Sequence, residues 1–222
     1  MMNKQLQRKI AEGEHQQQDF KYAINDSKKI ARSLAAFANT DGGSLLLGVK
    51  DNGKVIGVSS EEEFYMIEAA AQMYCKPPVD FETIEWKSEG KTVLEIKIPK
   101  SGNKPHKAPS KEGKYMVYVR VDDQNLLANK ILLEYWKAQQ KNSNQLLRFN
   151  KPEKFLLEYL SNHDSITFTR FYKLANIPRF KAERILVSLL CMNIIDIHIT
   201  EKQVFYTLSE NPDVHHTLGN LG

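Results

Sequence analysis

Residues 48–55 nearly match a phosphate-binding loop. They read GVKDNGKV and fit the pattern GxxxxGK, but Val55 stands where a serine or threonine must ligate magnesium. Such a loop also leads into a helix whose N-terminus faces the phosphates, whereas residues 55–58 are rich in β-branched side chains. Asn52 and Gly53 instead form a strong two-residue turn signal. The segment therefore predicts a β-hairpin and argues against ATP hydrolysis.

Two carboxylates, Glu14 and Asp19, stand five residues apart just before Phe20. An extended strand would place them on opposite faces, so they can act together only if the chain bends between them. His106 is a single histidine in a loop, and we expect it at the surface rather than as a general base. Cys75 and Cys191 lack metal-ligand spacing and are expected to be buried thiols.

Charge is distributed unevenly along the middle of the chain. Residues 61–85 hold seven acidic residues against one lysine, whereas residues 87–120 hold nine basic residues against three acidic ones. A basic segment beside Tyr115 and Tyr118 suits a polyanion such as nucleic acid. The alternative is a solvated, lysine-rich face of a sheet.

Length and composition limit the classes of protein that the sequence allows. The chain has 222 residues, of which 41% are hydrophobic, and a formal net charge of +4, which is ordinary for one medium or two small globular domains. Its apolar runs are too short to cross a bilayer, and its first residues lack the apolar core of a signal peptide. We therefore expect a cytoplasmic protein with no membrane partner.

The first 139 residues alternate helical and strand patterns. Apolar residues repeat at helical spacing between Asp26 and Asn39, with Asp26 or Ser27 as the N-cap. Residues 45–49 form an apolar run typical of a strand that is covered on both faces. A helix is expected over residues 64–74, strands over 79–86, 91–99 and 115–121, a loop over 101–113 and a helix over 126–140. This order predicts an α+β domain with a mixed sheet.

A second, smaller domain is expected over residues 153–209, after a polar linker at 140–152. Three helical patterns, the last beginning after Pro178, are followed by two alternating strands at residues 195–199 and 204–208. Three helices closed by a β-hairpin are typical of a winged helix, which is a helix-turn-helix with a wing. Residues 210–222 are expected to be a disordered tail.

The first domain resembles the Schlafen AlbA-like (AlbA_2) family over roughly residues 12–130. The resemblance rests on these segments: FK at residues 20–21, AFANT at 36–40, GG at 42–43, GVKD at 48–51, KP at 104–105 and YVRV at 118–121. It implies a DNA-binding regulator of the bacterial type.

The same resemblance implies a second function. Eukaryotic Schlafen proteins carry a metal-dependent RNA endonuclease whose three carboxylates correspond here to Glu14, Asp19 and Asp51. Carboxylates can hold Mg²⁺ or Mn²⁺, which activates water and neutralises charge on a phosphodiester. Asp19 is one methylene shorter than the family's usual glutamate. Asp51 equally suits the first position of an Asp-Asn-Gly turn.

The sequence thus predicts a DNA-binding transcriptional regulator, with a divalent-metal-dependent ribonuclease as the alternative. Binding would need no cofactor, and the partner would be nucleic acid, DNA before RNA. The oligomeric state stays open, with a homodimer as one candidate. The side chains expected to contact nucleic acid are Lys21, Lys28, Lys29, Arg32, Lys104, Lys107 and Arg120 in the first domain, and Arg179, Lys181, Arg184 and Lys202 in the second.

Overall fold

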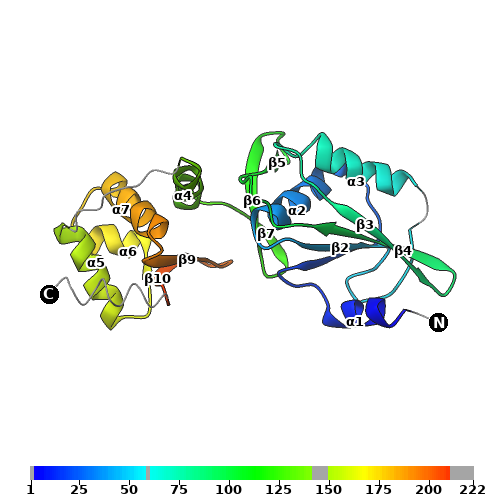
Figure 1. Cartoon of the computed structure of the whole chain (residues 1–222), viewed down its shortest axis with the longest axis horizontal. Helices are drawn as coiled ribbons and strands as arrows, with labels where there is room; N and C mark the ends of the chain where they lie inside the picture. The colour runs from blue at the N-terminus through cyan, green and yellow to red at the C-terminus, as the bar shows by residue number, and fades with distance from the viewer. Residues whose placement is uncertain (1–2, 59–60, 142–149, 211–222) are drawn as a thin grey trace. The chain divides into compact units, whose positions relative to one another are not determined.

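A computed structural model describes residues 3–58, 61–141 and 150–210. The chain divides into two units, Met1–Ala128 and Asn129–Gly222, and each is considered by itself. Figure 1 shows the elements of both units. None of the helices in the described ranges reaches the length and apolarity that a membrane crossing demands.

The first unit is built on a four-stranded sheet in the order β1-β2-β4-β3. Its strands are β1 (Gln18–Lys21), β2 (Gly43–Leu47), β3 (Glu82–Ser88) and β4 (Lys91–Ile98). β1 and β2 run parallel with Phe20 opposite Leu46, and the remaining pairs are antiparallel. A second sheet of β5 (Lys107–Pro109), β6 (Tyr115–Val121) and β7 (Gln124–Leu127) is antiparallel throughout. This confirms the predicted α+β class with a mixed sheet.

Helix α2 (Ser27–Asn39) lies at the centre of the main core and is almost entirely buried from Ile30 onward. The Asp26 side chain caps it by accepting hydrogen bonds from the backbone N–H groups of Lys28 and Lys29 at 2.8 and 3.3 Å. After the helix, Gly42 has φ +72°, and a Cβ there would lie 2.7 Å from the Ile98 carbonyl oxygen. Only glycine fits this corner, so the chain turns directly from α2 into β2.

Strand β2 is covered on both faces, as its continuous apolar run predicted. Leu45 and Leu47 belong to the main core, which also receives α3 (Glu62–Gln72). Leu46 faces a smaller cluster with Leu6 of helix α1 (Lys4–Glu12).

A buried carboxylate ties α1 to the sheet. The side chain of Glu95 is fully buried in β4, and its oxygens accept hydrogen bonds from Ser44 Oγ at 2.7 Å and Trp86 Nε1 at 2.8 Å. Lys9 Nζ of α1 completes the set at 3.0 Å. Burial opposes ionisation of Glu95, but these three donors outweigh it and lower the pKa of the carboxyl.

Residues 48–55 form the predicted hairpin and do not lead into a helix. Val49 and Val55 face each other across an antiparallel bridge, and Lys50 N–H donates to the Lys54 carbonyl at 3.0 Å. Gly48 has φ +92°, and a Cβ there would lie 2.7 Å from the backbone of Gly57. The geometry of a phosphate-binding loop is therefore absent from this segment.

Two short strands were not expected from the sequence. β5 lies within the predicted loop at 101–113, and the last two residues of β7, Leu126 and Leu127, were assigned to a helix beginning at 126. Helix α4 (Lys130–Gln140) begins later because the Asn129 side chain caps it by accepting from Leu132 N–H at 2.8 Å.

The second unit contains α4, α5 (Lys151–Asn162), α6 (Phe168–Leu174) and α7 (Arg179–Cys191) around one core. Its sheet has the order β8-β10-β9, formed by β8 (Ile166–Thr167), β9 (Ile195–Ile199) and β10 (Val204–Leu208). The sequence predicts the first domain to end at residue 139, but Ile131 of α4 lies in the core of the second unit. Most of the predicted linker and tail falls outside the described residues, and α5 begins at Lys151. The winged-helix assignment stays a prediction.

Candidate nucleic-acid interface

A cluster of basic and aromatic side chains joins α2, the end of α3 and the β5-β6 hairpin, which Figure 1 shows as neighbours. Arg32 Nε of α2 donates to the Pro109 carbonyl of β5 at 2.7 Å, and Pro109 pairs with Tyr115 of β6. Lys76 Nζ lies 4.2 Å from the centre of the Tyr115 ring. Each contact links residues far apart in sequence, so the cluster is a product of the fold.

The cluster continues along α2 and into the loop before β6. Lys28 Nζ lies 5.8 Å from the centre of the Tyr74 ring. Lys111 lies in the turn between β5 and β6, two residues after Pro109, to which Arg32 donates. In the same turn Ser110 Oγ donates to Glu112 at 2.8 Å, and this hydrogen bond lowers the pKa of Glu112. We call this surface the basic face and define it as Lys28, Arg32, Tyr74, Lys76, Lys111 and Tyr115.

The basic face offers what a nucleic acid requires from a protein surface. Lys28, Lys76 and Lys111 are exposed, so their ammonium groups can reach phosphates. The tyrosine rings lie directly beneath two of them, which places aromatic surface next to positive charge. Lys29 and Lys107, also predicted to contact nucleic acid, are exposed on the same elements, α2 and β5.

Lys104 is less available than predicted. Its side chain is half-buried, and Nζ donates to the Asn39 carbonyl at 3.2 Å. Burial and the neighbouring charge of Lys100 lower the pKa of Lys104.

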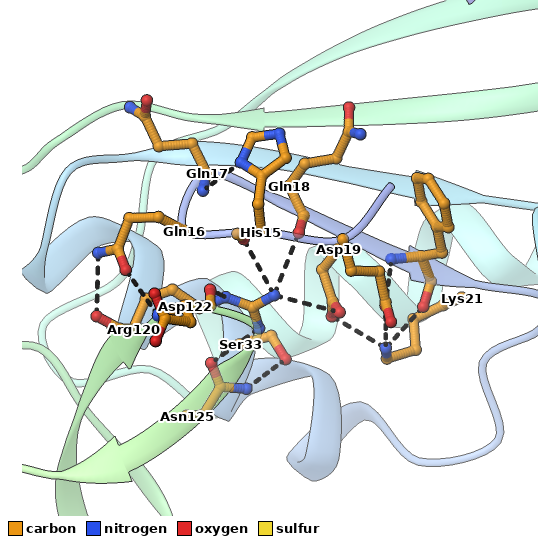
Figure 2. A network of polar contacts seen from close by, with 12 residues as sticks. His15, Gln16, Gln17, Gln18, Asp19, Lys21, Ser33, Arg120, Asp122 and Asn125 are labelled. Carbon is orange, nitrogen blue, oxygen red and sulfur yellow. Dashed lines mark hydrogen bonds and ion pairs between the residues drawn. The ribbon is translucent and has the colours of Figure 1, made fainter. Parts of the chain in front are cut away.

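A second cluster surrounds Arg120, which the structure places in the interior (Figure 2). The Arg120 side chain is 1% exposed and lies over the Phe37 ring. Nη2 donates to the carbonyls of His15 and Gln18 at 3.3 and 3.1 Å and lies 3.5 Å from Asp19 Oδ1. Its other nitrogens donate to the Asp122 carbonyl and to Asn125 Oδ1. The prediction that Arg120 contacts nucleic acid is therefore wrong for this structure, because the guanidinium is enclosed by protein acceptors.

Glu14 and Asp19 do come together, through the bend that their spacing requires. The bend is closed by a pair of backbone hydrogen bonds between His15 and Gln18. Burial and a hydrogen bond with Asp19 raise the pKa of Glu14, although a hydrogen bond from Phe20 N–H opposes the rise. Lys21 Nζ lies 2.9 Å from Asp19 Oδ2 and 3.8 Å from Glu14 Oε1. Lys21 is thus engaged by these carboxylates and would have to leave them to contact a phosphate.

Asp51 is not brought into this cluster. It is exposed in the hairpin turn, as expected for the first residue of an Asp-Asn-Gly turn. Within the ranges that the structure describes, no three His, Cys, Asp or Glu side chains are grouped so as to hold a metal. Glu14, Asp19 and Asp51 therefore do not fit Mg²⁺ or Mn²⁺ as one site, and Arg120 and Lys21 supply the positive charge beside Asp19 instead.

In the second unit the four predicted side chains are exposed. Arg179, Lys181 and Arg184 lie in the first half of α7, and Lys202 lies in the turn between β9 and β10. The Arg179 guanidinium lies 5.5 and 5.6 Å from the ring centres of Phe168 and Tyr172.

Sequence reasoning missed part of the basic face and misplaced one histidine. Lys76 stands in an acidic stretch and Tyr74 closes a helical pattern, so no local signal joins them to Lys28 or Tyr115. His106 was expected at the surface but is buried. Its backbone N–H donates to Asn39 Oδ1 at 2.8 Å, a contact across the fold that no spacing reveals.

Taken together, the first unit is an α+β domain with a basic, aromatic surface and a buried charge cluster. Residues 14–129 match the family described as Schlafen, AlbA_2. The chain belongs to this Schlafen AlbA_2 family. A comparison with curated proteins found no match.

Three solved structures are similar to parts of the chain. The DIP2311 protein of Corynebacterium diphtheriae shares 21% identity over 59% of this chain and 25% of its own, with a TM-score of 0.39. The N-terminal domain of a RecG-related protein from Nitrosomonas europaea shares 24% identity over 56% of this chain and 92% of its own, with a TM-score of 0.37. BpsR of Bordetella bronchiseptica shares 14% identity over 41% of this chain and 68% of its own, with a TM-score of 0.30. The chain thus spans a quarter of the DIP2311 structure, and these TM-scores are too low to transfer a property.

Proposed function

We propose that this protein binds nucleic acid through the basic face and acts as a DNA-binding transcriptional regulator. The observation that carries the proposal is the linked set of cations and tyrosines on α2, the segment that follows α3, and the β5-β6 hairpin. Lys76 over Tyr115 and Lys28 over Tyr74 place positive charge and aromatic surface side by side. The positive charge can bind phosphates, and the aromatic surface can stack on exposed bases or sugars.

The second unit is proposed to be a winged helix that contributes to DNA binding. Its elements follow the order helix, strand, two helices and β-hairpin from α5 to β10, which supports that class. In a helix-turn-helix the second helix presents its N-terminal residues to the major groove. Here Arg179, Lys181 and Arg184 occupy that part of α7, and Lys202 occupies the turn that would be the wing.

The test compares two triple variants with equal charge change. The first neutralises the basic face with Lys28→Gln, Lys76→Gln and Lys111→Gln. The control neutralises three exposed lysines of the same unit outside the face: Lys54, Lys87 and Lys97. Binding of labelled DNA duplex, RNA duplex and single strand of one sequence is measured by fluorescence anisotropy from 50 to 200 mM salt.

For the duplex, each lost phosphate contact should lower the slope of log affinity against log salt by about 0.9. The magnitude of this slope should therefore fall by roughly 2–3 in the basic-face variant, while the slope of the control stays near that of wild type. Equal losses in both variants would show that only net charge matters. An unchanged slope in the basic-face variant would refute the assignment of the interface, and a stronger preference for RNA would remove the regulator role.

A further inference from the structure

A cavity of about 250 Å³ lies beside the segment that joins β4 to β5. It is separate from the basic face as defined above, and the proposed nucleic-acid binding does not use it. Its walls combine apolar and polar groups, among them Ala38, Val79, Asp80, Lys100, Ser101 and His106. Its volume is below the roughly 300 Å³ at which most ligand pockets begin, so only a small molecule could enter it.

A serine and a buried histidine meet in the wall of this cavity. Ser101 Oγ lies 2.7 Å from His106 Nε2, and the other ring nitrogen, Nδ1, lies 2.9 Å from the Pro77 carbonyl oxygen. A carbonyl can only accept, so Nδ1 carries the proton and donates it to Pro77. In the neutral ring Nε2 is then an acceptor, and the Ser101 hydroxyl donates to it.

The surroundings hold His106 in this orientation. The residue is 4% exposed, and its backbone N–H and C=O are both bonded to the Asn39 side-chain amide at 2.8 Å. Asn39 in turn lies at the end of α2. His106 lies in the loop before β5, and these two hydrogen bonds tie it to the end of α2.

Ser101 itself remains accessible from the cavity. Its residue is only partly buried, and Oγ accepts one hydrogen bond, from Asn103 N–H at 3.0 Å. A hydroxyl oxygen has two lone pairs, so this bond leaves one for an electrophile. The Asn103 N–H also stabilises negative charge that develops on Oγ.

We propose that Ser101 is a nucleophile with His106 as its general base, and that the cavity accepts a small ester or another acyl or phosphoryl electrophile. Nucleophile, base and orienting acceptor have the spacing required for an activated hydroxyl. Ser101 Oγ forms a bond to the electrophilic carbon while the Oγ proton moves to His106 Nε2. The bond from carbon to the leaving alkoxide then breaks, and the proton passes from Nε2 to that alkoxide.

The test uses the full chain and a small dialkyl fluorophosphate, from which Oγ displaces fluoride. Labelling is followed by intact mass and located by peptide mapping. Three variants are compared with wild type. Ser101→Ala removes the nucleophile but keeps the backbone hydrogen bond from its N–H to the Ala38 carbonyl. His106→Gln removes the base. Ser110→Ala is the matched control, because Ser110 Oγ donates to a carboxylate, Glu112, rather than to an imidazole.

We expect a single adduct on Ser101 in wild type and in Ser110→Ala, and none in Ser101→Ala. In His106→Gln the labelling rate should fall by about 100-fold or more, since that is the usual contribution of a general base. Thermal unfolding checks that this variant is folded. If it is not, the rates at Ser101 and Ser110 within the wild-type molecule decide the question. Equal rates at the two serines, or no adduct on Ser101, would overturn the proposal without affecting nucleic-acid binding.

Discussion

Replacing Arg120 by methionine separates a buried structural role from a role in contacting nucleic acid. In the structure the guanidinium donates to three backbone carbonyls and to the Asn125 side chain and lies 3.5 Å from Asp19 Oδ1. Methionine keeps much of the apolar stem that packs on Phe37 but supplies no donor. Arg120→Met would therefore leave the Asp19 carboxylate with Lys21 as its remaining cationic partner, and four neutral acceptors without their donor.

The expected loss of stability is large. Removing one partner of a buried ion pair costs about 3–5 kcal/mol. Each neutral acceptor that stays buried without a donor adds about 1–3 kcal/mol, and less where water can enter. We expect the free energy of unfolding of the first unit to fall by at least about 3 kcal/mol, the lower end of the ion-pair cost. A surface arginine that only contacts phosphate would instead change stability by about 0.5 kcal/mol or less.

The assay is urea unfolding followed by tryptophan fluorescence. The chain has two tryptophans, Trp86 and Trp136, one in each unit, so Trp136→Phe leaves Trp86 as a probe of the first unit. Arg8→Met is the matched control, because Arg8 forms an exposed ion pair with Glu12 on α1, worth about 0.3–0.5 kcal/mol. A loss below about 1 kcal/mol in Arg120→Met, together with a reduced salt slope of DNA binding, would refute the buried role.

A double-mutant cycle then tests the pairing itself. Asp19→Asn should destabilise the wild type more than it destabilises Arg120→Met, because in the latter the cation is already absent. Equal losses in both backgrounds would show that Arg120 acts only through the backbone carbonyls.

Three further predictions concern Glu95, Cys75, and the pair of Lys181 and Arg184. The pKa of Glu95 is lowered from 4.5, so its stabilisation is present above pH 4.5 and is lost as the pH falls through the folded value. The difference in unfolding free energy between wild type and Glu95→Gln should shrink accordingly between pH 6 and 3; a constant difference would contradict this. Burial raises the pKa of Cys75 to about 12, so iodoacetamide at pH 8 should modify it only after unfolding, as mass spectrometry would show. Neutralising Lys181 and Arg184 should weaken duplex binding and lower its salt slope by about 2, whereas Lys173→Gln on α6 should leave it unchanged; unaltered binding would remove the winged helix from the interface.

Local patterns predicted much of the fold because each depends on neighbours in sequence. The cap at Asp26 and the hairpin around Gly53 are set by residues within a few positions, whereas Gly42 also needs space beside the distant Ile98 carbonyl. β5 and β7 were missed because three or four residues are too few for a strand pattern. The leucines of β7 were also mistaken for the first turn of α4.

The site was predictable only where charge and exposure coincide. Lys28 and Lys29 lie on the polar side of an amphipathic helix, so their exposure follows from the helical period. Lys76 belongs to the basic face because it contacts Tyr115 of β6. No local sequence pattern predicts that contact. The spacing of Glu14 and Asp19 allowed them to meet only through a bend, which the structure supplies. The position of Asp51 relative to them depended on the tertiary fold.

For Arg120, the sequence contained a signal for burial but none for the identity of its partners. It lies in a strand whose residues 117–121 are otherwise apolar on both faces, a pattern that indicates burial on both sides. A charged side chain in such a strand must find buried partners, so its burial was predictable. The identity of those partners was not, because Gln18 and Asp19 lie about a hundred residues away. A basic residue inside a buried strand is therefore evidence for an internal ion pair before it is evidence for a bound phosphate.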